Sequence, residues 1–549
     1  MPVTITDHAV AAHDSFDLEL EFPLGAGVGL WTPEARGHRT LPPDWANRTT
    51  TSLVQSAPVV VLHDAEGIGL WGLACSEVVG EISIRGGVSE EHKSVRLSLH
   101  AAAESGDRVV RLATTDAPAP LAEVIGELSA WLGEVNQITA LPLPRAATEP
   151  VFSTWYTYTQ DVNHDNVVAE GRMAAELGCR SLFVDDGWQV GGHGRGYGRC
   201  GEWIPDTDKF PDLRATVDEL RSLEIDTVLW IAPLLLGMDS PVVSQLGQYA
   251  PKGDERNRMW ILDPRHGPVR EFVASTCARI VTDYGVAGLK IDFLNNAMVY
   301  AGEVVDNPGE GFVADVGEAM RMMLGQVRSR LADAGLAEPI IEFRQPYVSP
   351  AITAYGNCIR VGDCPADAVV NRQGSLDLRL FVREVAVHAD PLMWARDGGA
   401  VAVAQQFQST FFSVPQVSMP LATLDDEQRK TLAHQLRLWR DWREVALFGR
   451  LSVQGSELGY TQARAVHDRR AVVAVWRPEL VDLTDLDVDE VLVLNGSTVD
   501  GLLLRDVDDW EPVSCWGPSG VPTESDAPAP AFGTVVLRPR PGRASRQRP

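Results

Sequence analysis

The sequence has too few basic residues for a protein that binds nucleic acid. It carries 48 Lys and Arg against 75 Asp and Glu, which gives a formal net charge of −27. A field of that sign repels phosphate backbones and anionic membrane surfaces. A neutral substrate such as a sugar is compatible with this charge, although many proteins are acidic for solubility alone.

Long apolar runs and paired cysteines are absent as well. No run of about 18 apolar residues, the length needed to cross a membrane as a helix, occurs in the chain. Its seven cysteines form no CxxC pair and are odd in number, so the sequence indicates neither a disulfide framework nor a zinc cluster. The first residues lack the basic and apolar regions of a secretory signal, and we therefore expect a cytoplasmic location.

The composition is that of a globular protein with more than one domain. Hydrophobic residues make up 45% and charged residues 22% of the 549 positions, a length that suggests about three units. Short alternating segments at 14–22, 57–64 and 81–87 predict an antiparallel β domain over residues 1–145. A proline-rich stretch at 141–150 is typical of a linker.

The middle of the chain predicts a (β/α)8 TIM barrel over residues 146–447. Short, strongly apolar runs alternate there with segments of helical periodicity, the pattern of parallel strands joined by crossover helices. Eight runs can be counted, and they begin at residues 151, 179, 226, 288, 339, 358, 388 and 409. An amphipathic helix at 427–447 closes the barrel.

Short strands return after the barrel. Apolar segments at 470–478, 490–496 and 533–540 predict a C-terminal β-sandwich over residues 448–540. Residues 541–549 read as a disordered basic tail.

Carboxylates that end apolar runs are the candidates for chemistry, because reactive groups in such barrels lie at the carboxyl ends of strands. Asp292 and Asp363 end the fourth and sixth runs, and glycoside hydrolysis needs two carboxyl groups flanking the bond. Lys290 stands two residues before Asp292, on the same face of a strand, where a cation would keep that carboxylate ionised. The spacing does not give the separation of the carboxyl groups, so retention or inversion stays open at this point.

Further polar and aromatic side chains end other runs. Ring faces stack on pyranoses, and carboxylates and guanidinium groups hold their hydroxyls. The candidates are Asp185, Asp186, Arg344, Arg360, Trp155, Trp188, Trp203, Trp230, Tyr156 and Tyr347.

Six segments resemble the α-galactosidases of glycoside hydrolase family thirty-six and their relatives in the same clan. They are TWYTY (154–158), LFVDDGWQ (182–189), GEWIPDTDKFPD (201–212), LWIAP (229–233), GLKIDF (288–293) and RVGD (360–363). They span the expected barrel in the family's order, whereas the flanking regions match only in general architecture.

The resemblance implies a retaining α-glycosidase, with α-galactosidase as the single best interpretation. It implies that Asp292 is the nucleophile of a double displacement and Asp363 the acid/base. Asp185 and Asp186 would bind the O4 and O6 hydroxyls of galactose, and Lys290 would reach neighbouring hydroxyls. Arg360 and Trp230 would shape the pocket, and no metal or organic cofactor is implied.

Two departures from the family pattern leave alternatives open. The run RVGDCPAD offers Asp367 beside Asp363, and we prefer Asp363 because it ends the apolar run directly. Many relatives carry a Cys and Gly-rich turn near the C2 substituent, whereas this chain has Arg344, Gln345, Pro346 and Tyr347. The sugar therefore need not be plain galactose.

Structural roles compete with these functional ones. Asp185 and Asp186 could form a turn or a helix cap, Lys290 and Asp292 a buried ion pair, and Asp363 a turn. We interpret Asp390 and His388 as structural.

Other functions also remain. A transglycosylase of the raffinose-synthase type would use the same two aspartates, and a sugar-binding protein would keep the pocket without turnover. We expect an oligosaccharide or glycoside substrate, no nucleic acid and no membrane partner, while a homo-oligomer is left open.

Overall fold

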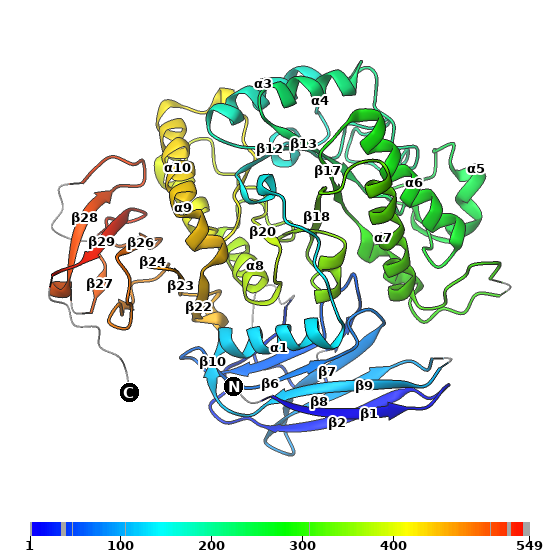
Figure 1. Ribbon diagram of the computed structural model, residues 1–549, viewed down its shortest axis with the longest axis horizontal. Helices are drawn as coiled ribbons and strands as arrows, with labels where there is room; N and C mark the ends of the chain where they lie inside the picture. The colour runs from blue at the N-terminus through cyan, green and yellow to red at the C-terminus, as the bar shows by residue number, and fades with distance from the viewer. Residues whose placement is uncertain are drawn as a thin grey trace.

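The protein folds into three parts that follow one another along the chain (Figure 1). The computed structural model describes residues 3–33, 40–46, 48–104, 106–306, 308–505, 507–523 and 529–541. Within these residues no helix is both long enough and apolar enough to cross a membrane. The expected disordered tail lies, apart from residue 541, outside the described residues.

The N-terminal part is an antiparallel β domain, as expected. One sheet has the order β1-β9-β6-β5-β3 with β10 beside β6, and a second has the order β2-β8-β7-β4. Alternate side chains of both sheets meet in one apolar core. The strands are β1 (Thr4–Val10), β2 (Phe16–Pro23), β3 (Gly29–Trp31), β4 (Arg48–Thr51), β5 (Val59–His63), β6 (Ile68–Cys75), β7 (Ile82–Ser89), β8 (Ser94–Ala101), β9 (Arg108–Thr115) and β10 (Ala119–Pro120).

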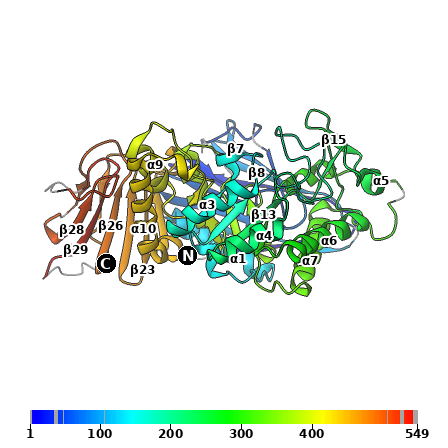
Figure 2. The same cartoon turned by 90° about the horizontal axis from the view of Figure 1, so that it is seen from above.

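Helix α1 (Leu121–Val135) joins this domain to the barrel, a role that the strand pattern did not predict. Its apolar side chains face β6, and the hydroxyl of Ser129 donates to the carbonyl of Phe381 at 2.6 Å. Figure 1 shows the helix lying between the N-terminal sheets and the barrel. Seen from above, much of the N-terminal domain lies behind the barrel (Figure 2).

The central part is the expected barrel of eight parallel strands. Their order is β20-β19-β18-β17-β13-β12-β11-β21, and a parallel bridge between His388 and Val414 closes the ring. The strands are β11 (Val151–Ser153), β12 (Ser181–Val184), β13 (Asp226–Ile231), β17 (Gly288–Ile291), β18 (Ile340–Arg344), β19 (Cys358–Arg360), β20 (Ala386–His388) and β21 (Gln416–Val417).

Helices cover the outside of the barrel, and short elements decorate the loops. The covering helices are α3 (His164–Glu176), α4 (Leu213–Ser222), α6 (Gly267–Tyr284), α7 (Val316–Asp333), α8 (Ala368–Phe381), α9 (Gly399–Ser409) and α10 (Asp426–Phe448). The loops carry α2 (Trp155–Tyr158), α5 (Val243–Leu246) and a small sheet of β14 (Leu235–Gly237), β15 (Lys252–Asp254) and β16 (Met259–Ile261).

Three of the apolar runs form less strand than their length suggested. The run that begins at residue 388 contributes only its first residue, because β20 ends at His388. The first run ends as a strand at Ser153 and continues as α2, and the last run is extended only at β21. The side chain of Ser418 links the ends of the first and last of these strands. Its hydroxyl donates to the carbonyl of Ser153 at 2.7 Å and accepts from the backbone N–H of Tyr156 at 3.0 Å.

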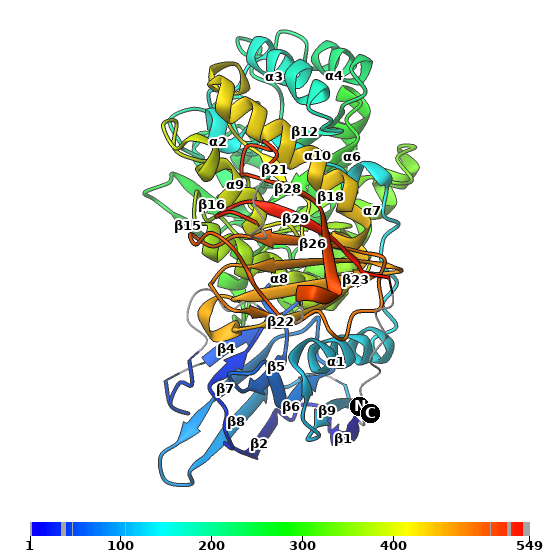
Figure 3. The ribbon, with the colours of Figure 1, turned by 90° about the vertical axis from the view of Figure 1, so that its left-hand side faces the viewer.

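The C-terminal part is a six-stranded sheet that lies beside α10 (Figure 3). Its order is β22-β23-β24-β26-β29-β28, and β25 pairs with β27 separately. Val472 and Ala474 of β24 join the main core, while Ala471, Val473 and Val475 join a second core on the other face. The strands are β22 (Arg450–Gln454), β23 (Gln462–His467), β24 (Arg470–Val475), β25 (Leu480–Val481), β26 (Glu490–Asn495), β27 (Leu503–Leu504), β28 (Trp510–Trp516) and β29 (Thr534–Pro539).

Candidate active site

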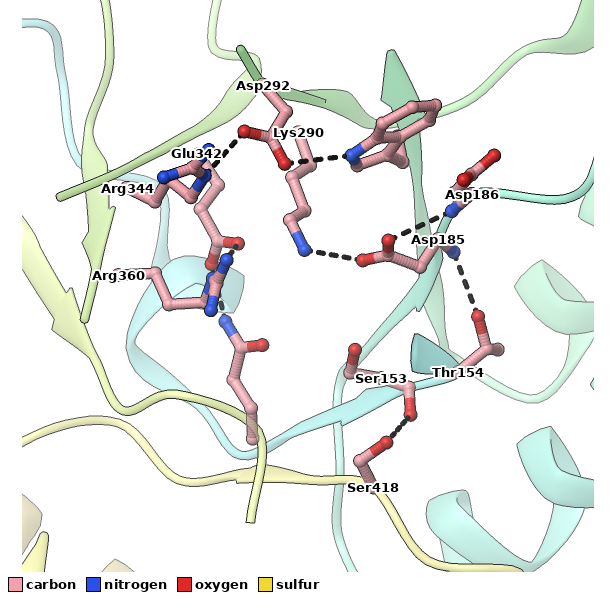
Figure 4. Close-up of polar contacts among 12 residues, drawn as sticks. Ser153, Thr154, Asp185, Asp186, Lys290, Asp292, Glu342, Arg344, Arg360 and Ser418 are labelled. Atoms are coloured by element: carbon pink, nitrogen blue, oxygen red, sulfur yellow. Dashed lines mark hydrogen bonds and ion pairs between the residues drawn. The ribbon is translucent and has the colours of Figure 1, made fainter. Parts of the chain in front are cut away.

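Polar side chains from several barrel strands converge at the carboxyl ends of the ring (Figure 4). Asp185 and Asp186 follow β12, Lys290 lies in β17, and Asp292 follows that strand directly. Arg344 is the last residue of β18. The predicted cluster therefore exists, although its ion pairs differ from the expected ones.

Asp292 is held by three donors from three segments. Its Oδ1 accepts from Arg344 Nε at 2.5 Å and from its neighbour's backbone, Phe293 N, at 2.7 Å. Its Oδ2 accepts from the indole Nε1 of Trp230 at 3.1 Å. Burial raises the pKa of Asp292, but the charges of Arg344 and Lys290 outweigh burial and hold the pKa below its ordinary value. The group is thus an ionised carboxylate in a nearly dry site.

Lys290 binds Asp185 rather than Asp292. Its Nζ lies 2.5 Å from Asp185 Oδ2, and both side chains are almost completely buried. Lys290 acts on Asp292 through its charge alone, so the expected cation effect holds while the expected direct pair does not. Asp185 also accepts from the backbone of Asp186 at 2.9 Å through its other oxygen.

Asp186 is fixed by two amides that the sequence did not single out. Gln160 Nε2 donates to Oδ2 at 2.6 Å and Gln189 Nε2 donates to Oδ1 at 2.7 Å. Burial outweighs these hydrogen bonds and raises the pKa of Asp186 to about 6. Gln189 follows the DDGW motif directly, which is the one signal that could have pointed to it.

Asp363 and Asp390 share the guanidinium of Arg360. Arg360 Nη2 donates to Asp363 Oδ1 at 2.8 Å, and Nη1 contacts Asp390. Burial raises the pKa of Asp363, but Arg360 and Lys290 outweigh it and hold that pKa far below its usual range. The side chain of Asp363 remains 54% exposed, whereas Asp390 is completely buried.

Asp390 takes part in the site more directly than expected. Its Oδ2 accepts from Tyr156 Oη at 2.9 Å and from the backbone of Cys364 at 2.8 Å. Burial outweighs the attraction of Arg360 and raises the pKa of Asp390 to about 6. His388, in contrast, lies inside the barrel against Glu342 at 2.7 Å, so its structural interpretation agrees with the fold.

Asp367, the alternative to Asp363, lies away from this network. Its Oδ1 accepts from the backbones of Val369 and Val370 at 3.1 and 2.9 Å, which caps the first turn of α8. A capping carboxylate is already engaged in holding a helix end, and Asp363 is the aspartate of this segment that faces Arg360.

The tryptophan candidates take different positions around the barrel mouth: some would form the wall of the site, and another packs behind that wall. Trp203 lies edge-on to Trp230 at 5.7 Å between ring centroids, and both rings are buried. Trp188 is completely buried and donates to the carbonyl of Trp230 at 2.8 Å, so it supports the wall from behind. Trp155 is half-buried at the mouth, with the guanidinium of Arg195 at 5.9 Å from its ring.

Tyr347 and Tyr197 add to this wall. Tyr347 is completely buried, and its hydroxyl accepts from the backbone of Leu294 at 2.8 Å. Tyr197 belongs to the glycine-rich segment between β12 and α4 and packs edge-on to Phe293 at 5.5 Å. Burial and the charges of Asp186 and Asp292 raise the pKa of Tyr197.

Known proteins match this barrel. Residues 143–325 match the family model described as Melibiase. This part of the chain is therefore similar to the Melibiase family. It holds Asp185, Asp186, Lys290 and Asp292, whereas Arg344, Arg360, Asp363 and Asp390 lie beyond the matched residues.

Relatives that the chain matches are α-galactosidases by name. Alpha-galactosidase 2 of Pediococcus pentosaceus is 27% identical over 148 residues, which are 26% of this chain and 20% of that one. Alpha-galactosidase AgaA of Geobacillus stearothermophilus is 24% identical over 159 residues, 28% of this chain and 21% of that one. The aligned segments thus span about a fifth of these relatives.

Solved structures share the fold over nearly the whole chain. A family thirty-six α-galactosidase AgaA from Geobacillus stearothermophilus in complex with raffinose has a TM-score of 0.65 at 15% identity, covering 95% of this chain and 76% of that one. The α-galactosidase from Lactobacillus brevis has a TM-score of 0.65 at 13% identity, covering 100% and 79%. The domains on either side of the barrel therefore belong to the shared architecture.

Gly187, in the loop after β12, gives a stability prediction. Its φ is +119°, and a Cβ there would lie 2.6 Å from the backbone of Gln160. We expect Gly187→Ala to lower the free energy of unfolding by about 2–4 kcal/mol and to loosen Asp186. Thermal or urea unfolding measures this loss. The control is Gly194→Ala in the same loop, with φ +67° and no atom within 4 Å, for which we expect about 1 kcal/mol; equal losses would contradict the steric explanation.

Proposed function

We propose that the chain is a retaining α-galactosidase that hydrolyses terminal α-linked galactose from oligosaccharides or simple glycosides. The observation that carries this proposal is the buried, ionised carboxylate of Asp292 at the end of β17, in a barrel mouth that also carries Asp363 on Arg360. The melibiase match and the α-galactosidase relatives, one of which holds raffinose, support galactose as the sugar.

Asp292 is the proposed nucleophile. Its carboxylate would attack the anomeric carbon, so that a carbon–oxygen bond to Asp292 forms while the bond to the leaving oxygen breaks. A nucleophile of this kind must be ionised at working pH, and the charges of Arg344 and Lys290 provide that condition. Water then attacks the same carbon from the opposite side and releases Asp292.

Asp363 is the proposed acid and base. Arg360 and Lys290 hold its pKa far below the usual range in the free site, so it would have to take up a proton as the substrate binds. It would then give this proton to the leaving oxygen in the first step and take a proton from water in the second. The two carboxylates repel, since the charge of Asp363 raises the pKa of Asp292. Ester formation removes the charge on Asp292 and thereby lowers the proton affinity of Asp363, which favours its change from acid to base.

The sugar hydroxyls are assigned to the remaining carboxylates. Asp185 and Asp186 would accept from O4 and O6, and their fixed partners Lys290, Gln160 and Gln189 hold them in place. Trp230 and Trp203 would form the wall against which the sugar lies, and Trp155 would lie nearer the aglycone. Arg360 orients Asp363 rather than holding a hydroxyl.

A screen of nitrophenyl glycosides tests the proposal. We expect turnover of the α-galactoside, with lower rates on the α-glucoside, α-N-acetylgalactosaminide, α-xyloside and β-L-arabinopyranoside. Proton NMR during the reaction would show α-galactose first, because double displacement retains configuration. Folded protein that cleaves none of these substrates would refute the proposal, and a first product of β configuration would refute retention.

Asp390 yields a prediction for the pH profile. Without the charge of Asp390, Asp363 is the carboxylate that keeps its hydrogen bond to Arg360, and a carboxylate that repels Asp363 is lost. The pKa of Asp363 should therefore fall further. We expect Asp390→Asn to move the basic limb of kcat, which reports the enzyme–substrate complex, to lower pH, since Asp363 would then lose its proton earlier. The control is Tyr156→Phe, which removes only a hydrogen bond that lowers the pKa of Asp390 and should therefore move the limb less than Asp390→Asn does. A limb that moves to higher pH would contradict the shared-guanidinium interpretation.

A further inference from the structure

A chain of buried charges runs from the barrel interior to the site. Glu342 lies in β18 next to Arg360 of β19, and both side chains are almost completely buried (Figure 4). The Oε2 atom of Glu342 accepts from His388 Nδ1 at 2.7 Å and from Gln416 Nε2 at 2.5 Å. His388 Nε2 lies 2.8 Å from the carbonyl of Ala147. Since both ring nitrogens of His388 face oxygen acceptors, both donate, and the ring is an imidazolium cation.

One contact in this chain is left open. Arg360 uses Nη1 for Asp390 and Nη2 for Asp363. Its Nε faces Oε1 of Glu342 across 3.8 Å, and neither atom has a hydrogen-bond partner among the described residues. A buried donor and a buried acceptor that face each other unpaired destabilise the site, and a shift of about 1 Å would join them. Glu342 therefore offers the guanidinium a second place to bind.

The acid role of Asp363 requires such a second place. Burial raises the pKa of Asp363, but Arg360 and Lys290 outweigh it and hold that pKa far below its usual range. A general acid must nevertheless carry a proton in the substrate complex. Once Asp363 is protonated, it attracts the guanidinium less, because a neutral carboxyl group binds a cation more weakly than a carboxylate does. The guanidinium is then free to move toward Glu342.

We propose that Glu342 is a positioning residue that receives the Arg360 guanidinium when Asp363 takes up its proton, and that His388 holds Glu342 in place for this role. The assignment rests on the proposed glycosidase function. Asp363 is 54% exposed and takes the proton from solvent as the sugar binds, and only hydrogen bonds change. Burial lowers the pKa of His388, but the contacts with Cys358 and Glu342 outweigh burial and raise the pKa to about 10, so the ring is charged at neutral pH.

Other charged and titratable groups surround these contacts. Those that face Arg360 or Asp363 from neighbouring elements are Lys290, Arg344, Asp292, Asp390 and Tyr156. The two cations among them favour the ionised form of Asp363, and the two carboxylates repel it. Glu342 differs from all of them because its free oxygen faces an unpaired donor of Arg360.

Proton uptake on sugar binding tests the proposal without turnover. Calorimetric titration with galactose in two buffers of different ionisation enthalpy gives the number of protons bound per sugar. We expect the wild type to take up about one proton at neutral pH and Glu342→Gln at most about half of that, because Arg360 then stays with Asp363. Asp363→Asn should take up none. Glu170→Gln, which removes a different buried carboxylate, bound to Tyr158, should match the wild type.

The basic limb of kcat on raffinose is an independent readout. We expect Glu342→Gln to move this limb to lower pH by roughly one unit, because Asp363 loses its proton earlier when Arg360 has no second partner. His388 loses its own partner in this variant, but it lies farther along the chain of contacts from Asp363, so the loss of Glu342 decides the sign. His388→Gln should move the limb to higher pH, since Glu342 then has Arg360 as its remaining cation. A fall in kcat with the limb unmoved in both variants would indicate a structural role and overturn the assignment.

The assignment of Glu342 and the proposed function fail separately. Proton uptake that depends on Glu342, in a protein that cleaves no glycoside, would refute the hydrolase proposal alone. Normal turnover with equal proton uptake in the wild type and Glu342→Gln would overturn the assignment of Glu342 alone. If Glu342→Gln does not fold, a structure of Asp292→Asn with bound p-nitrophenyl α-galactoside decides. Arg360 Nε and Glu342 Oε1 should then lie about 3 Å apart, and a distance that stays at 3.8 Å would overturn the assignment.

Discussion

Asp292→Asn is expected to lower kcat on p-nitrophenyl α-galactoside by at least about 10⁴-fold. The amide is nearly the same size, and its oxygen in the place of Oδ1 still accepts from two of the three donors, but it carries no negative charge and cannot form the ester. Steady-state and single-turnover kinetics measure the loss. Residual activity within about tenfold of the wild type would contradict the nucleophile assignment.

A matched chemical test identifies the role of Asp292 and not only its importance. Asp292→Gly leaves room for azide, which would attack the anomeric carbon in place of the missing carboxylate. We expect β-galactosyl azide as the product, because one displacement inverts the configuration. Thermal unfolding of the variants and calorimetric binding of galactose show whether the site remains folded, since the change leaves Arg344 without its carboxylate partner.

Asp363→Asn should be the second large effect, and it should depend on the leaving group. With raffinose, whose leaving oxygen needs a proton, we expect kcat/KM to fall by roughly 10²- to 10⁴-fold. With a dinitrophenyl α-galactoside, which leaves without a proton, the first step should be nearly unaffected. A fall of equal size on both substrates would contradict the acid role.

Asp367→Asn is the control for Asp363. Asn caps a helix as well as Asp does, and the hydrogen bonds to the first turn of α8 can be kept. We expect no change in either substrate's kinetics. Azide with Asp363→Gly should give α-galactosyl azide, since it attacks the ester from the opposite side. If Asp367→Asn lost activity while Asp363→Asn stayed active, Asp367 and not Asp363 would be the acid and base.

The barrel and the strand ends were largely readable from the sequence. Each of the eight apolar runs contributes residues to one of eight strands in chain order, because a strand buried on both faces must be apolar throughout. Asp185, Lys290 and Asp292 lie at the mouth because each ends or follows such a run. Local patterns of this kind depend on neighbouring residues, which the sequence shows directly.

The partners of these groups were decided by the tertiary structure alone. Arg344 meets Asp292 across 52 positions, Lys290 meets Asp185 across 105, and Arg360 meets Asp390 across 30. Each pair joins different barrel strands, and their side-chain direction depends on the closed ring and not on spacing along one strand. The sequence thus determined which residues reach the barrel mouth, whereas the fold determined which cation holds which carboxylate and so which carboxylate is ionised.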